Sequence, residues 1–237
     1  MCTFRKALKQ TLSAFTLGLI LFLFGWTERS AAAAMVIVPL QLQQESLISA
    51  KIPQFIDGFA PAVISYHNEK FRQLVFASLA DFEQIAVKTR LAPELPEQMK
   101  NAITLIAEYE VCRNDEKVIS LVQRIYQYTG GAHGMTTQTG STVDRLTGKS
   151  WSLADLFVPG ADYGGRLTAI VRKVGADRKL PMWDFRGIGV HSAFFLSDEG
   201  LVLFFQPYEI APYSEGIVKI VIPYAKLSDI FRAELKL

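Results

Sequence analysis

Three histidines and one glutamate are the side chains best suited to chemistry in this chain: His67, His133, His191 and Glu209. A hydrolytic metal site usually places two histidines one helical turn apart, or clusters histidines with carboxylates. These histidines lie far apart in the sequence, so only convergence in the folded chain would build such a site. The sequence also lacks a Gly-x-Ser-x-Gly elbow and a glycine-rich phosphate loop. It therefore predicts neither a metal site nor a cofactor.

His133 lies in the glycine-rich string Gly130–Gly134, between two runs that are typical of strands. Glycines in such places usually mark a bulge, a turn with positive φ, or a close backbone approach. The alternative is that the bent backbone projects His133 into a cleft with Tyr128 or Tyr208. Both interpretations stay open at this point. The glycines expected to have the structural role are Gly130, Gly131 and Gly134.

A second candidate is the string Tyr208–Tyr213, which contains two tyrosines, Glu209 and Pro212. Tyrosines beside prolines commonly hold a chain crossing, with the hydroxyl bonded and the ring packed. A carboxylate among apolar neighbours is either bonded to a turn backbone or exposed as a contact. The string therefore predicts a pinned crossing or a contact surface.

The stretch Asp177–Val190 is the expected contact loop. Trp183, Phe185 and Arg186 are residue types that are enriched at protein interfaces. Long aromatic loops are often functional. The alternative is that Trp183 and Phe185 fold back and close the edge of the core.

The elements around these residues are best defined in Phe194–Leu227. Asp198–Gly200 supplies a tight turn between two apolar runs, and a third run follows the crossing. Between Ala60 and Arg90, apolar residues recur at intervals of three, four or seven, which predicts a long amphipathic helix. Its expected buried face consists of Ile64, Phe71, Val75, Ser78, Phe82 and Ile85, with His67 on the polar faces.

The remaining segments predict further strands and short helices. Their order predicts an α+β fold, with antiparallel sheets on which a long amphipathic helix and shorter helices pack. Strands are expected at Val36–Gln43, Ser46–Pro53, Asn101–Cys112, Lys117–Thr129 and Met135–Val143. Helices are expected at Leu153–Phe157 with Ser152 as its cap, at Gly164–Val174, and at Leu227–Leu235 with Ser228 as its cap.

Residues 1–34 have the pattern of a secretory signal. Basic residues precede the apolar run Leu12–Trp26, and Ala31–Ala34 then offers a small-residue cleavage site. The run is shorter than the ~20 residues that span a bilayer. We therefore expect a cleaved signal and an exported protein, periplasmic or at the cell surface. The alternative is an uncleaved anchor, which would be the chain's contact with the membrane.

The charge balance depends on this segment, which holds four of the 25 basic and one of the 23 acidic residues. Without it the chain has 21 basic and 22 acidic residues and a net charge of about −1. Basicity is then no argument for a nucleic-acid partner, and none is expected. Cys112 would be the one remaining cysteine, so the fold must rest on its core, and we expect a buried structural thiol.

Three strings carry a family resemblance: Tyr126–Gly134 (YQYTGGAHG), Asp144–Phe157, and Gly200–Tyr213 (GLVLFFQPYEIAPY). Together with Ile52–Gln54 they resemble the extracytoplasmic PdaC/RsiV-like domain of lysozyme-sensing anti-sigma factors and peptidoglycan deacetylases. We expect neither a sigma-binding region nor a metal-dependent catalytic domain, and therefore the shared binding portion alone. By this resemblance, residues 35–115 form the N-terminal half of the domain. Residues 116–237 form the C-terminal half, which carries the YTGGAHG and PYEIAPY motifs.

The resemblance implies an exported, non-catalytic binding domain at the bacterial cell envelope. The first hypothesis is recognition of a lysozyme-like protein. The second is a peptidoglycan- or glycan-binding module whose aromatic rings stack on sugars, and the third is a hydrolase site at His133 and Glu209. The expected ligand- or partner-binding residues are Tyr128, His133, Trp183, Phe185, Arg186, Tyr208, Glu209 and Tyr213.

Overall fold

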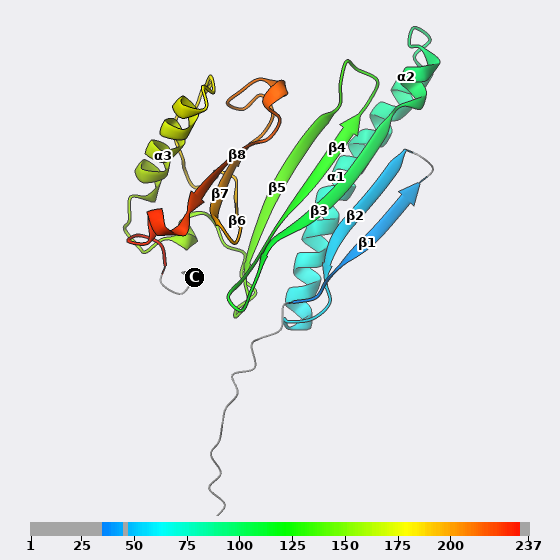
Figure 1. Ribbon diagram of the computed structural model, residues 1–237. Helices are drawn as coiled ribbons and strands as arrows, with labels where there is room; N and C mark the ends of the chain where they lie inside the picture. The colour runs from blue at the N-terminus through cyan, green and yellow to red at the C-terminus, as the bar shows by residue number, and fades with distance from the viewer. Residues whose placement is uncertain (1–34, 45–46, 233–237) are drawn as a thin grey trace, which may run out of the picture. The chain divides into compact units, whose positions relative to one another are not determined.

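A five-stranded sheet in the order β1-β2-β3-β4-β5 forms the first part of the fold (Figure 1). The computed structural model describes residues 35–44 and 47–232. Strand β2 pairs with β3 in parallel, because a helical crossover carries the chain back between them. The sheet is therefore mixed, whereas the sequence predicted antiparallel sheets. The strands are β1 (Ile37–Gln44), β2 (Ile48–Phe55), β3 (Thr104–Asn114), β4 (Val118–Tyr128) and β5 (Met135–Asp144).

Helix α1 (Pro61–Leu91) lies along one face of this sheet, and the short helix α2 (Glu97–Asn101) follows it (Figure 1). The predicted position of this helix is confirmed. Proline suits the first turn of a helix, because the N–H that proline lacks would have no partner within the helix there. The predicted face is correct in its centre and wrong near the end, where Ile85 is 42% exposed. The helix instead buries His67, Phe71, Val75, Phe82, Ala86 and Thr89.

The prediction that His67 lies on a polar face of the helix is wrong. The structure shows that its side chain is buried. Its Nε2–H donates to the carbonyl of Gly148 at 2.8 Å, and its ring packs among Phe55, Phe59 and Phe71. Burial lowers the pKa of His67 below its usual value. The hydrogen bond explains how a polar side chain is accommodated in an apolar cluster.

A second sheet, antiparallel and in the order β6-β7-β8, carries the predicted strand, turn, strand and crossing. Helix α3 (Tyr163–Asp177) lies beside it, and its first turn is capped by the Asp162 carboxylate, which accepts from the N–H of Gly165 (Figure 1). Strand β7 is buried on both faces because one face meets α3 and the other meets Val122 of β4. The strands are β6 (Phe194–Leu196), β7 (Gly200–Phe205) and β8 (Val218–Pro223).

Two predicted short helices differ from the structure. Ser152 does not cap a helix, because its hydroxyl donates to the Asp155 carboxylate and the segment forms only a 3-10 turn, η1 (Ala154–Leu156). Ser228 does not begin a closing helix either. It ends a second 3-10 turn, and Phe231 then bridges to Phe157. Residues 233–235 of that predicted helix lie outside the described residues. That turn is η3 (Tyr224–Leu227), and a further 3-10 turn, η2 (Tyr213–Glu215), precedes β8.

A buried arginine joins the two sheets. Arg113 of β3 is 3% exposed, its Nε bonds the Asp115 carboxylate, and its Nη1 donates to the hydroxyl of Tyr224 at 2.8 Å. That hydroxyl donates in turn to the carbonyl of Ser197 at 2.7 Å. Arg113 also lies over the Tyr224 ring, 5.3 Å from its centre. We call Arg113, Asp115, Ser197 and Tyr224 the arginine clamp.

Cys112 is partly buried rather than fully buried as predicted. Burial, followed by the nearby Glu110 carboxylate, raises the pKa of its thiol to about 11, so little thiolate forms at neutral pH. Within residues 35–44 and 47–232, no helix is long and apolar enough to cross a bilayer. The predicted signal at residues 1–34 lies outside the described residues.

Candidate functional site

The glycine-rich bend between β4 and β5 fixes the position of His133. Gly130 has φ +96°, and a Cβ there would come within 2.8 Å of Thr89 on α1. A Cβ on Gly134 would come within 2.3 Å of the Tyr126 ring. The bend therefore needs glycine for backbone conformation at Gly130 and for close packing at Gly134. Gly131 has room for a side chain, since its nearest neighbour would be 4.0 Å away.

His133, Tyr208 and Tyr213 meet at this bend, and we call them the aromatic cluster. The His133 ring stacks on Tyr213 with centres 3.9 Å apart, and Tyr208 lies 5.8 Å from Tyr213. The carbonyl of Gly134 can only accept, so His133 Nδ1–H donates to it at 2.9 Å. In the neutral ring Nε2 is then the acceptor for the Tyr208 hydroxyl, 3.3 Å away. Tyr213 anchors the cluster by donating to the Gly134 carbonyl at 2.8 Å.

Tyr208 occupies an unusual backbone conformation. The carbonyl of Gln206 accepts from the N–H of Glu209 at 3.0 Å, which closes a turn with Pro207 second and Tyr208 third. Tyr208 has φ +69°, and this turn position normally takes glycine. Glu209 caps the turn, because its carboxylate accepts from the N–H of Gln206 at 2.7 Å. The structure therefore favours the turn-bonded alternative for Glu209 and leaves Tyr208 as a strained, half-exposed ring.

A groove of about 430 Å³ borders Tyr213, and we call it the basic groove. It contains two cationic side chains. Arg124 bonds Glu110 and the amide oxygen of Gln138, and the Lys219 ammonium lies 5.9 Å from the Phe195 ring centre. The groove thus places two cations beside Tyr213, whose ring belongs to the aromatic cluster. Its lining residues are Arg124, Thr136, Pro207, Tyr213, Ser214, Gly216, Ile217 and Lys219.

In the predicted contact loop, one aromatic side chain folds back onto the core and the other stays exposed. Phe185 folds back, and its ring packs edge-on against Phe205 of β7 with centres 5.7 Å apart. Trp183 is 43% exposed, although its backbone N–H donates to the carbonyl of Ile210 at 3.0 Å. Arg186 is exposed at the rim of a cavity of about 230 Å³ that Phe185 and Glu209 also line. Only Trp183 and Arg186 therefore remain available as contacts.

Not all predicted site residues come together. Tyr128 ends β4 opposite Thr104, and among the described residues no ring contact or side-chain hydrogen bond links it to the aromatic cluster. His133 does not line the cavity that contains Glu209, so the two do not share a cleft there. The described part of the chain also contains no group of three or more His, Cys, Asp or Glu side chains placed to hold a metal ion.

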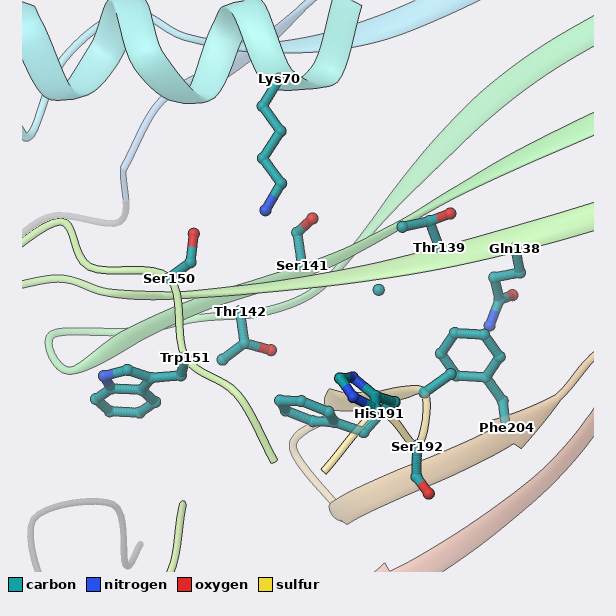
Figure 2. Close-up of a pocket in the computed structure, with 13 residues that line it drawn as sticks. Lys70, Gln138, Thr139, Ser141, Thr142, Ser150, Trp151, His191, Ser192 and Phe204 are labelled. Atoms are coloured by element: carbon teal, nitrogen blue, oxygen red, sulfur yellow. The ribbon is translucent and has the colours of Figure 1, made fainter. Parts of the chain in front are cut away.

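A further cleft, of about 340 Å³, was not predicted from the sequence (Figure 2). It surrounds the free edge of β5 at Gly140, and we call it the edge cleft. Figure 2 shows Lys70 reaching from α1 toward Ser141, with Ser150 to one side and Trp151 farther along the cleft near Thr142. The sequence did hold one signal, since a glycine inside a Thr-rich strand often marks a close approach. A Cβ on Gly140 would come within 2.0 Å of the Phe194 carbonyl.

Two family models match adjoining parts of the chain. Residues 41–136 match the model described as deacetylase PdaC, and residues 154–225 match a protein family of unknown function, DUF3298. The chain carries a PdaC/DUF3298-like domain. The peptidoglycan-N-acetylmuramic acid deacetylase PdaC of Bacillus subtilis is 25% identical over 138 residues. That match covers 55% of this chain and 30% of the deacetylase, so the chain spans under a third of that relative.

Two solved structures share the fold of the PdaC/DUF3298-like domain. A DUF3298 family member from Bacteroides fragilis superposes with a TM-score of 0.66 at 18% identity, covering 86% of this chain and 96% of that one. A DUF3298 family protein from Pseudomonas aeruginosa gives 0.59 at 22% identity, covering 86% and 97%. At these identities the likeness shows the fold alone, which confirms the α+β class.

The residues of the aromatic cluster come from both of the matched segments. His133 lies in the PdaC segment, whereas Tyr208 and Tyr213 lie in the DUF3298 segment. The aromatic cluster is therefore built where the two segments meet. The division into halves at residues 115 and 116 stays a prediction.

Proposed function

We propose that this chain is an exported, non-catalytic module that binds the glycan of the bacterial cell envelope. The observation that carries the proposal is the aromatic cluster beside the basic groove. Its rings are held in place by hydrogen bonds to the bend, and Tyr208 is 49% exposed. Exposed rings with a fixed orientation suit stacking on the apolar faces of sugars.

The backbone at Tyr208 supports a binding role. A left-handed conformation costs a non-glycine residue about 1–2 kcal/mol, so the fold alone would favour glycine at this position. The tyrosine adds little burial, because half of its side chain is exposed. Strain at an exposed side chain is a feature that often accompanies a functional surface.

The charges in the basic groove indicate which glycan would fit. Lys219 has its ammonium group near an aromatic ring and not in an ion pair within the described residues. Arg124 keeps a partly exposed side chain, although it pairs with Glu110. Both cations suit a carboxylate-bearing sugar. The relative's name mentions N-acetylmuramic acid, which carries a carboxylate, and this supports the same choice.

The direct test is cosedimentation with insoluble peptidoglycan. Tyr208→Ala should weaken binding by about threefold to tenfold, because it removes one stacking ring. The matched control is Tyr66→Ala on α1, where a tyrosine is also exposed but lies outside the aromatic cluster and the basic groove. Equal binding by both variants and the wild type would refute the aromatic cluster as the binding surface.

A second candidate function is recognition of a lysozyme-like protein through the contact loop. The observation that favours it is the exposed Trp183, which lies between two non-glycine residues with positive φ, Met182 and Asp184. Exposed tryptophans are frequent anchors at interfaces. Calorimetric titration with a c-type lysozyme tests it, and Trp183→Ala should abolish the heat while leaving peptidoglycan sedimentation unchanged. Lysozyme binding that survives Trp183→Ala would exclude this loop.

A further inference from the structure

Strand β5 has one uncovered position on its outer edge between Gln138 and Thr142. It is the last strand of its sheet, and alternate residues turn their N–H and C=O outward. At Gln138 both outward groups bond the side-chain amide of Gln206, at 3.1 and 2.8 Å. At Thr142 the carbonyl accepts from the N–H of Trp151 at 2.8 Å. By the same alternation, the N–H and C=O of Gly140 face outward between these two covered positions.

The gap at Gly140 is one residue long, which limits what can enter it. A long extended peptide cannot continue along β5, because Gln206 covers the edge on one side and Trp151 on the other. A single residue with one N–H and one carbonyl-type oxygen can form the two bonds of an antiparallel pair. The end of a peptide chain meets both conditions.

The charge in the edge cleft indicates which end of a peptide would bind there. Lys70 lines the cleft, is exposed, and has no carboxylate within ion-pair distance in the described part of the chain. In Figure 2 its ammonium group points toward the hydroxyl of Ser141. The cleft has no acidic side chain in its lining. A cation beside a short open edge therefore favours a terminal carboxylate.

We propose that the edge cleft binds the carboxyl-terminal residue of a short peptide. The peptide N–H donates to the Gly140 carbonyl, and one carboxylate oxygen accepts from the Gly140 N–H. The second carboxylate oxygen accepts from Lys70, and the Trp151 ring borders the side chain of the bound residue. This site shares no residue with the aromatic cluster or the basic groove, so it stands or falls independently of glycan binding.

Nuclear magnetic resonance titration of the ¹⁵N-labelled protein tests the proposal. The probes are N-acetyl-L-alanyl-L-alanine, its D,D counterpart, the carboxamide of each, and acetate. Both bonds need the amide and the acid together, so an acid dipeptide should shift the Gly140 amide signal. Its carboxamide should bind about tenfold more weakly, because a charge-assisted bond is lost. Preference for the L or the D acid would identify a protein terminus or a peptidoglycan stem peptide as the source.

Lys70→Met is the decisive variant, since Lys70 is exposed and its loss should leave the fold intact. It should weaken binding of the acid dipeptide about tenfold and leave binding of the carboxamide unchanged. Lys88→Met is the matched control, because Lys88 lies on the same helix outside the cleft. The proposal is overturned if the Gly140 signal does not move with either acid, if acetate moves it equally, or if Lys70→Met binds as the wild type does.

Discussion

The arginine clamp and the aromatic cluster both join the two parts of the fold through a tyrosine hydroxyl. Tyr224 donates to the carbonyl of Ser197 in the clamp, and Tyr213 donates to the carbonyl of Gly134 in the cluster. Their surroundings differ. Arg113 is 3% exposed, whereas Tyr208 is 49% exposed and has a left-handed backbone.

The difference in exposure suggests that the arginine clamp stabilises the fold and the aromatic cluster binds a ligand. A buried charge contributes to the fold only while its partners remain, because solvent cannot replace them. An exposed ring on strained backbone adds little to the fold, so its presence calls for another explanation. Substitutions in the clamp should therefore lower the free energy of unfolding, and substitutions in the cluster should lower binding.

The largest expected effect is in the clamp. Arg113→Ala should lower the free energy of unfolding by about 3 kcal/mol, the lower end for breaking a buried pair, because Asp115 is partly exposed and can be solvated. Urea unfolding measures it. The matched control is Arg166→Ala, since Arg166 and Asp229 form an exposed pair that should be worth about 0–1 kcal/mol. Equal losses in the two variants would show that burial does not distinguish the clamp.

His67 belongs with the clamp as a buried polar group, and its effect depends on pH. Burial holds its pKa below the usual value near 6.5, so the unfolded chain binds the proton more readily. The contribution is therefore fully present above pH 6.5 and is lost as the pH falls through 6.5 toward the lowered pKa. Urea unfolding at a series of pH values should show this loss, and His67→Gln should reduce it. His191→Gln, at an exposed histidine, is the control, and an unchanged slope in His67→Gln would contradict the assignment.

Local patterns in the sequence predicted much of the fold. The long helix followed from the helical period, and β6 to β8 followed from the turn residues and prolines around them. The parallel pairing of β2 with β3 was missed, because pairing across a helical crossover leaves no local mark. His67 was missed because its burial depends on the carbonyl of Gly148, far along the chain.

The candidate site was less predictable than the fold. The glycines and prolines around His133 and Tyr208 marked bent backbone, and the structure places these two side chains in contact. Tyr128 was included for its type and neighbourhood, yet it ends β4 opposite Thr104 and makes no ring contact with the cluster among the described residues. The edge cleft was missed because Lys70, Gly140 and Trp151 meet only through the tertiary packing of α1, β5 and a turn.

The smallest expected stability effect is the sharpest test of the comparison. Glycine is normally less stabilising than alanine by about 0.5–1 kcal/mol, because it gains more freedom in the unfolded chain. At Tyr208 the order should reverse, since alanine keeps the left-handed strain of about 1–2 kcal/mol and glycine relieves it. Tyr208→Gly should therefore unfold at the same or a higher urea concentration than Tyr208→Ala.

Both variants at Tyr208 lose the same ring, so peptidoglycan sedimentation should fall equally in the two. Greater stability of Tyr208→Gly with equally weak binding would show that the tyrosine is kept for its contact and not for the fold. If Tyr208→Ala were the more stable variant, the strain at this turn would be absent in solution. The argument from strain to binding would then fail, while the arginine clamp would keep its role in stability.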